Sequence, residues 1–267
     1  MNTSPTQCDP RTTQELVNTT LTNDEDAADS IYWDAMRELH RRGTVEVFNA
    51  AKSLCESPCP VEQRIGCVIL AQLGGSESPF ASRSFPLVVS VMERVENLDT
   101  LASALCALGW FGDPRGVSHV LPYLDHPDSD IRYWVTHALT ALREDQRSID
   151  GLIHLSSDAA AEVRDWATCG LGSLIDRDSP AIREALIARL GDLDDIVRGE
   201  ALVGLAKRQD SRVIEPLRQA LEARTFSKTA NDYAGEALDA LENLDQYPQL
   251  LAWKMPTDRV DTTRDIS

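Results

Sequence analysis

Basic residues are scarce in this sequence, and their scarcity excludes one class of partner. The 267 residues include 26 Lys and Arg against 43 Asp and Glu, which gives a net charge of −17. The largest basic groups are only Arg41-Arg42 and Lys207-Arg208. Duplex binding requires Lys or Arg at several phosphates, and an acidic surface repels DNA. We therefore expect no nucleic-acid partner. The acidic balance suits a protein partner with a basic face, or it serves solubility alone.

Long apolar runs are also missing. No stretch of about 18 apolar residues occurs, so the sequence predicts no membrane span. The N-terminus lacks the basic start and apolar stretch of a secretory signal. These two absences predict a cytoplasmic protein.

Metal-binding and catalytic patterns are absent as well. Cys55, Cys59 and Cys67 surround a turn, but they lack the tight pair and the fourth ligand that zinc requires. The five histidines are scattered, and none is followed by Glu. There is no glycine loop for a phosphate, no Gly-x-Ser-x-Gly and no His-Glu-x-x-His. We therefore predict no metal, no cofactor and no catalytic residue, and we favour a protein that is not an enzyme.

What the sequence does contain is a repeat. One leucine recurs at intervals of 31 to 35 residues, at Leu39, Leu70, Leu105, Leu139, Leu171, Leu205 and Leu238. Counting from an anchor position seven residues before each leucine, the residues at offsets 3, 6, 7 and 10 are mostly apolar or small. These offsets form one stripe of a helix. Small residues at offset 6 should let neighbouring helices approach closely.

Each repeat continues with a turn and a second apolar pattern at helical spacing, as in Val117, Val120, Leu121 and Leu124. Each unit is therefore predicted to be two short helices that bury their stripes by stacking on the next unit. We predict an all-α solenoid of about seven helix pairs over residues 29–253. Residues 1–28 should form a flexible acidic tail with a short helix near 13–21, and residues 254–267 a polar tail.

Three copies carry a more specific motif. Asp128-Ser129-Asp130-Ile131-Arg132, Glu162-Val163-Arg164 and Asp194-Asp195-Ile196-Val197-Arg198 each precede Ala or Val, and then Ala/Gly-Leu. This pattern resembles the HEAT repeat in the short form found in bacterial proteins and phycobilin lyases. The resemblance implies a right-handed superhelix with the second helices of the pairs on its concave side. It also implies that Arg132, Arg164 and Arg198 form a ladder with acids of adjoining repeats.

One feature goes beyond the repeat consensus. Two residues past the anchor, successive repeats carry Trp134, Trp166, Glu200 and Tyr233, which stacking would place in a row. Such a row could bind a partner, or it could fill gaps between stacked helices. The candidate partner-binding residues are Trp134, Trp166, Tyr233, Arg132, Arg164, Asp165, Arg198, Glu200 and His137. The sequence favours a non-enzymatic protein-binding scaffold or adaptor; the alternative is a phycobilin-lyase-like protein that attaches or chaperones a chromophore.

Overall fold

The computed structural model describes residues 9–23, 31–75, 79–223, 228–242, 246–251 and 253. Regular structure in these residues is helical throughout. The α-helices are α1 (Thr13–Thr22), α2 (Ile31–Arg42), α3 (Val45–Glu56), α4 (Pro60–Gln72), α5 (Ala81–Arg94), α6 (Leu98–Phe111), α7 (Val117–Val120), α8 (Ser129–Ala141), α9 (Gln146–Leu155), α10 (Ala161–Cys169), α11 (Pro180–Arg189), α12 (Asp195–Lys207), α13 (Ile214–Ala223), α14 (Lys228–Ala240) and α15 (Pro248–Leu251). Short 3₁₀ turns lie at Pro114–Gly116, Leu121–Tyr123 and Ser211–Val213, and a π-helical turn lies at Gly170–Leu174. None of the described helices is long and apolar enough to span a lipid bilayer.

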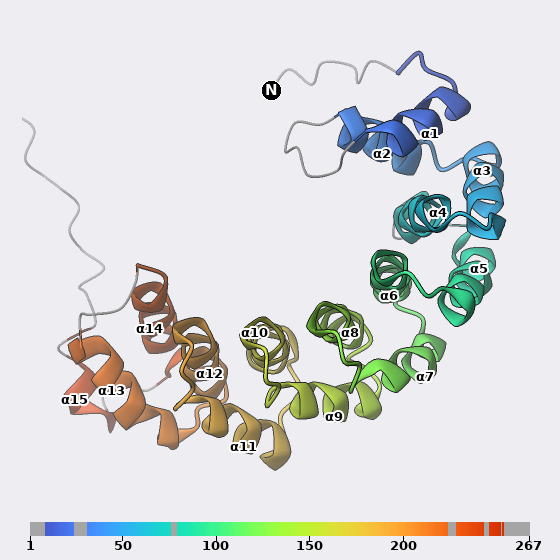
Figure 1. The fold of residues 1–267 in the computed structure, drawn as a ribbon. Helices are drawn as coiled ribbons and strands as arrows, with labels where there is room; N and C mark the ends of the chain where they lie inside the picture. Colours follow the sequence, from blue (N-terminus) through green and yellow to red (C-terminus); the bar gives the residue numbers. More distant parts are fainter. Residues whose placement is uncertain are drawn as a thin grey trace, which may run out of the picture. The chain divides into compact units, whose positions relative to one another are not determined.

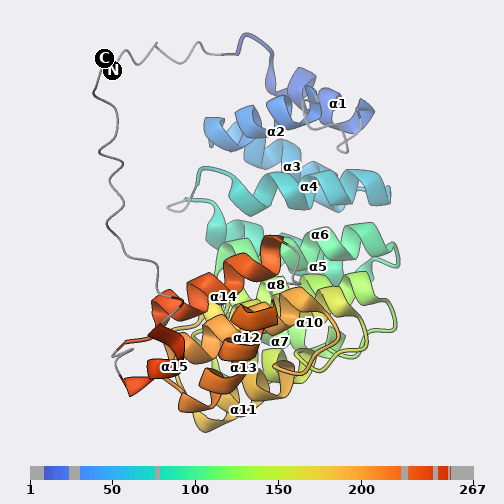
Figure 2. The ribbon, with the colours of Figure 1, turned by 90° about the vertical axis from the view of Figure 1, so that its left-hand side faces the viewer.

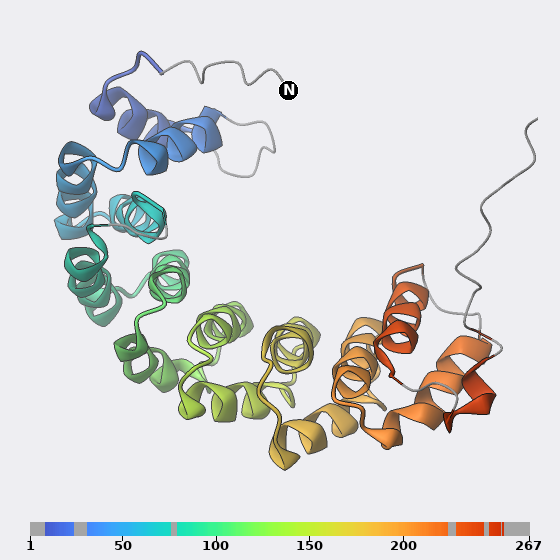
Figure 3. The same ribbon diagram turned by 180° about the vertical axis from the view of Figure 1, so that it is seen from behind.

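The chain divides into two compact units, Met1–Gly151 and Leu152–Ser267. In unit 1, helices α2, α4, α6 and α8 pack side by side in one layer, and α1, α3 and α5 lie in a second layer against them (Figure 1). Figure 2 shows α2, α4 and α6 lengthwise, one above another. Unit 2 repeats the pattern, with α10, α12 and α14 in contact in one layer and α11 and α13 in the other (Figure 3).

The predicted solenoid of seven helix pairs is confirmed over the described residues, but the phase of the pairs differs from our prediction. Helix α1 packs on α2, α3 on α4 and α5 on α6. The second and third of these pairs therefore begin with α3 and α5, which we had assigned as second helices, and the first begins with α1, which we had placed in the tail. A sequence period gives the length of a repeat and not the point where it begins. With this phase, α2, α4, α6 and α8 are the second helices of their pairs.

The predicted short helix at 13–21 is present as α1, but it is packed rather than loose. Leu16 and Val17 are 0% and 3% exposed, and Thr12 and Glu15 form a reciprocal capping box at the helix start. The folded part of the chain therefore begins before residue 29. The rest of the predicted N-terminal tail at 1–8 and 24–28, and the predicted C-terminal tail at 254–267, lie outside the described residues.

The predicted second helix at Val117–Leu124 is interrupted. Only Val117–Val120 is α-helical, and 3₁₀ turns flank it on both sides. Pro122 lies at this break, and proline cannot donate the backbone hydrogen bond that continues an α-helix.

The repeated leucines form the core, as the spacing predicted. All seven are buried, with at most 4% of the residue exposed. The acids of the repeat motif begin the helices: Asp128 and Asp194 accept hydrogen bonds from the first free backbone N–H groups of α8 and α12. Sequence spacing and local capping therefore agree on where each of these helices starts.

Small residues allow the predicted close helix approach in unit 2. A Cβ added to Gly204 of α12 would lie 2.6 Å from the Cα of Gly172. Gly204→Ala should therefore lower the free energy of unfolding by about 1 to 3 kcal/mol, because backbone atoms must move apart. Gly235→Ala in α14 is the matched control: no heavy atom lies within 4 Å of its Cβ, so the gain in helix propensity should leave the protein unchanged or more stable by up to about 1 kcal/mol. Equal effects of the two changes in urea unfolding would contradict this packing.

Candidate functional site

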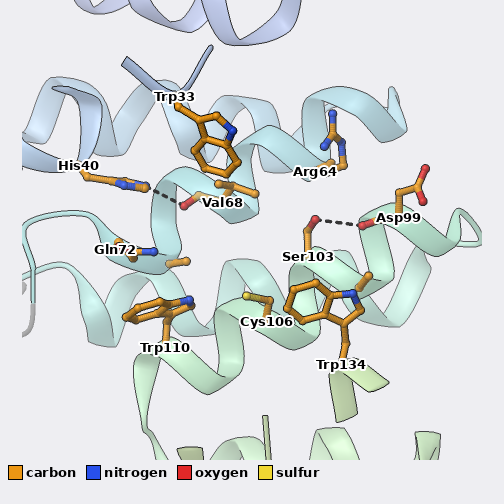
Figure 4. Close-up of a pocket in the computed structure, with 12 residues that line it drawn as sticks. Trp33, His40, Arg64, Val68, Gln72, Asp99, Ser103, Cys106, Trp110 and Trp134 are labelled. Atoms are coloured by element: carbon orange, nitrogen blue, oxygen red, sulfur yellow. Dashed lines mark hydrogen bonds between the residues drawn. The ribbon is translucent and has the colours of Figure 1, made fainter. Parts of the chain in front are cut away.

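Three of the five tryptophans line one hollow of unit 1. Trp33 comes from α2, Trp110 from α6 and Trp134 from α8, and their rings border the hollow from different sides (Figure 4). Its volume is about 540 Å³. The other residues that line it are small or apolar (Val68, Ala71, Ala102 and Cys106) or polar (His40, Arg64, Gln72, Asp99 and Ser103). The result is an aromatic hollow large enough for one or two amino-acid side chains.

Two further hollows adjoin this one. The first, of about 480 Å³, shares His40, Gln72 and Trp110 with it and extends to Gly74 and Gly75. The second, of about 310 Å³, shares Asp99, Ala102 and Trp134 and extends to the start of α8. We call these three hollows together the tryptophan groove. It is formed by helices of one layer only: α2, α4, α6 and α8, with the turn after α4.

The tryptophans differ in how firmly they are held. The ring of Trp33 lies edge-on to Tyr32 with centroids 4.9 Å apart, and that of Trp134 lies 5.5 Å from Tyr133 and 5.2 Å from His137. Trp110 is 60% exposed. A tryptophan that is left mostly in water beside a hollow is a feature of surfaces that bind partners.

The imidazoles of this region are neutral at pH 7. His40 Nε2 donates to the carbonyl of Val68 at 3.0 Å, and burial outweighs this bond and lowers the pKa of His40. Burial also lowers the pKa of His137 beneath Trp134. The charges along the groove therefore come from its carboxylates and arginines.

These charges are separated along the groove. Asp99, Asp128 and Asp130 line the hollow at the starts of α6 and α8. Arg64 lines the first hollow, of about 540 Å³, which we call the central hollow. Arg41 lines the hollow at the other end, and its guanidinium bonds Glu38 at 2.7 Å. One end of the groove is thus lined by three carboxylates, the central hollow by Arg64 together with Asp99, and the other end by Arg41.

Of the three tryptophans that line the central hollow, only Trp134 was among the predicted site residues. Residues of the groove fall at offsets 1, 5, 8 and 12 from the anchor, as Arg64, Val68, Ala71 and Trp110 do. These offsets form a stripe of the helix beside the core stripe. Trp33 is at offset 1 of its repeat and Trp110 is at offset 12 of its repeat. These two offsets differ by about three helical turns, so the residues lie on equivalent faces of α2 and α6. A search for aromatic residues on that stripe would have found both.

The three arginines of the predicted ladder share a contact within their own repeat. Arg132, Arg164 and Arg198 each donate to the carbonyl six residues earlier, at 2.7, 3.0 and 2.6 Å. Each anchor arginine therefore clamps the loop that precedes its own helix. Arg164 in addition forms the predicted pair between repeats, with both oxygens of Asp192 at 2.8 Å. Arg198 bonds Asp195 of its own helix.

The predicted residues of unit 2 form a packed cluster. Glu200 is 7% exposed and accepts from Ser173 Oγ at 3.2 Å. The ring of Tyr233 packs on Gly199, where an added Cβ would lie 2.5 Å from a ring atom. Tyr233 and Glu200 therefore fill space between α12 and its neighbours. Trp166 is half-buried.

Reactive chemistry is not favoured in this cluster. Burial, followed by the charge of Glu200, raises the pKa of the Cys169 thiol to about 12, so the thiolate is rare at neutral pH. Burial and Glu200 also raise the pKa of Tyr233 above its ordinary range. Within the described residues, no group of three or more His, Cys, Asp or Glu side chains could hold a metal ion.

Asp165 makes the stability of unit 2 dependent on pH. Burial, and then the carboxylates of Glu200, Asp194 and Glu162, raise the pKa of Asp165 from 3.8 to about 6. Between pH 3.8 and pH 6 the chain therefore takes up a proton at Asp165 when it folds. The free energy of unfolding rises as the pH falls through 6. Asp165→Asn should stabilise the protein at neutral pH by about 1 kcal/mol, since solvent screens this half-exposed site, and the gain should vanish near pH 4.

Thermal unfolding of Asp165→Asn and of the parent at both pH values checks this prediction. Asp239→Asn, at an exposed position of α14, is the control and should change little at either pH. A gain for Asp165→Asn that is equal at both pH values would contradict the assignment to proton uptake.

Comparison with known proteins supports the repeat architecture. Residues 85–172 and 149–233 match the family model of HEAT repeats, together more than half of the chain. Protein YibA of Escherichia coli (strain K12) is 24% identical over 209 residues, which cover 76% of this chain and 74% of that protein. The X-ray structure of YibA aligns with a TM-score of 0.67 at 21% identity, covering 91% of this chain and 90% of that chain. The archaeal HEAT-like repeats protein from Thermococcus onnurineus NA1 aligns with a TM-score of 0.55 at 14% identity, covering 87% and 97% of the two chains. These likenesses establish a shared fold.

Proposed function

Because the chain belongs to the HEAT-repeat family, we propose that it is a protein-binding module that holds a segment of a partner protein in the tryptophan groove. The exposed ring of Trp110 beside the aromatic hollow carries this proposal. Large aromatic side chains supply most of the energy at many protein interfaces. A rigid helical layer can present them without the cost of ordering a loop on binding.

Two features of the groove favour a protein segment over a flat protein surface. The three adjoining hollows follow one another across α2, α4, α6 and α8, which suits an extended chain. Each hollow has room for a side chain, so successive residues of a segment could fill them. The phycobilin-lyase alternative rests on the shared repeat.

The proposal predicts that Trp110→Ala abolishes capture of the partner. The full-length tagged protein, parent and variant, would be used to capture proteins from lysate of the source cells, and the captured protein would be purified and titrated. Loss of a central aromatic contact should weaken binding by about 2 kcal/mol or more, which is about thirtyfold. The stability of Trp110→Ala should stay close to that of the parent, because the side chain is mostly exposed.

Leu193→Ala is the matched control, since it removes an apolar side chain that is 95% exposed and lies in unit 2, outside the groove. This variant should bind like the parent. A partner that is bound equally well by parent and Trp110→Ala would place the binding surface elsewhere and overturn the proposal.

A further inference from the structure

We infer that the partner segment carries a lysine or arginine, and that its cationic group binds at the acidic end of the tryptophan groove, between Asp99, Asp130 and the rings of Tyr133 and Trp134. This inference rests on the proposed function and adds the chemistry of the partner. It predicts a basic, extended segment with an apolar or aromatic residue close to the basic one.

The acidic end combines two kinds of group that attract cations. Its hollow of about 310 Å³ is lined by the carboxylates of Asp99, Asp128 and Asp130 and by the rings of Tyr133 and Trp134. Carboxylates bind a guanidinium or ammonium group through charge-assisted hydrogen bonds. The face of a tryptophan or tyrosine ring attracts the same cations. A neutral or acidic side chain would gain from neither.

The carboxylates differ in how far the protein already uses them. Asp128 caps α8 by accepting from the N–H groups of Asp130 and Ile131 at 2.8 and 3.3 Å. Among the residues that the structure describes, no cation forms an ion pair with the side chain of Asp99 or Asp130. Elsewhere in unit 1 an aspartate at a turn binds the arginine two residues later, as in Asp113–Arg115 at 2.6 Å and Asp145–Arg147 at 2.7 Å. The carboxylates of Asp99 and Asp130 are therefore available to bind a cationic group of a partner.

The other charges of the groove fix where the cation goes. Arg64 shares the central hollow with the carboxylate of Asp99, whereas the described residues that line the acidic end include three carboxylates and neither Lys nor Arg, so a cation is favoured at the acidic end. His40 is neutral at pH 7 because burial lowers its pKa. The apolar side chain of the segment should therefore bind in the hollow of about 540 Å³. The basic side chain should bind in the neighbouring hollow at the acidic end, on the other side of Trp134 and Asp99, which line both hollows. The net charge of −17 would also speed the approach of a basic segment.

The test uses the full chain as bait for a phage-displayed library of short random peptides. Selected peptides would be synthesised and titrated by fluorescence anisotropy at low and high salt. We expect selected sequences to combine Arg or Lys with a nearby aromatic or aliphatic residue. The double variant Asp99→Asn/Asp130→Asn should bind them about tenfold more weakly at low salt and with less dependence on salt. Glu46→Gln, at an exposed acid in α3 of the other layer, should bind like the parent.

Each outcome separates this inference from the proposed function. Peptides that require Trp110 but lack basic residues, or that bind the double variant unchanged, would overturn the cationic partner and leave the groove as a binding site. Failure to select any peptide that depends on Trp110 would overturn both. The double variant Asp99→Asn/Asp130→Asn should weaken binding of the peptide. An Arg→Gln change in the peptide should then weaken binding to the double variant no further. Both results together would support pairing between the carboxylates of the groove and the arginine of the peptide.

Discussion

Arg208→Met should unfold at a much lower urea concentration than the parent. The side chain of Arg208 is 6% exposed, and its guanidinium donates to the carbonyls of Leu171 at 2.6 Å, Gly172 at 3.0 Å and Ile175 at 2.8 Å, and to two others. The carbonyls of Leu171, Gly172 and Ile175 belong to the π-helical turn and its exit, where the helix itself supplies no donor. Methionine fills a similar volume but leaves the carbonyls buried without a partner. We expect a loss of about 3 to 5 kcal/mol in the free energy of unfolding.

Arg218→Met is the matched control for this change. Arg218 forms ion pairs with Glu215 and Glu222 on the surface of α13, where solvent screens the charges, so its replacement should change the stability little. Arg208→Lys should recover only part of the stability, because one ammonium group cannot reach carbonyls in so many directions. A loss for Arg208→Met no larger than that for Arg218→Met would show that the buried guanidinium does not hold this turn.

Asp192→Asn should have the second largest effect on stability. The side chain of Asp192 is 4% exposed, binds Arg164 through both oxygens at 2.8 Å and also bonds Arg189 at 3.4 Å. An asparagine would leave two arginines short of a negative partner, and breaking a buried pair costs about 3 kcal/mol or more. Burial alone would raise the pKa of Asp192, but the bonds from Arg164 and from the N–H of Asp194 outweigh it and hold the pKa below the usual 3.8.

The pH dependence of this effect follows from the lowered pKa. Because the carboxyl of Asp192 is ionised more readily in the folded chain than in the unfolded chain, its contribution is complete above pH 3.8 and is lost as the pH falls below that value. The difference between Asp192→Asn and the parent should therefore shrink in acid. Asp195→Asn removes a carboxylate that is 44% exposed and pairs with Arg198, so it should cost about 1 kcal/mol or less. Similar losses for the two variants at neutral pH would contradict a buried link between repeats.

Much of the architecture could be predicted because it depends on short stretches of chain. The spacing of Leu139, Leu171 and Leu205 predicted three buried helix stripes, and all three leucines are fully buried. The acids at Asp128 and Asp194 begin their helices, because a carboxylate can cap the first N–H groups without help from distant residues. The phase of the pairs could not be predicted, because it depends on which neighbour each helix packs against.

The candidate site shows the same division. Trp134 was identified from its place in the repeat, but Trp33 and Trp110 occupy other offsets and come from α2 and α6. Only the stacking of the helices brings these three rings to one hollow. Stacking also places the ring of Tyr233 against Gly199, which favours the packing interpretation of this residue.

By itself the sequence determined that the chain is helical and repetitive, where α8 and α12 begin, which leucines form the core and that the surface is acidic. These properties follow from periodicity, local hydrogen bonding and composition, which act within one repeat. Only the tertiary structure decided which side chains share a surface: the tryptophan groove, the buried link from Arg164 to Asp192 and the five carbonyls around Arg208. Except for the bond from Arg208 to the carbonyl of Gly204, four positions away, the hydrogen bonds of Arg164 and Arg208 named here join residues 28 to 37 positions apart. The physical reason is that the distance between such residues in space is set by how one repeat packs on the next.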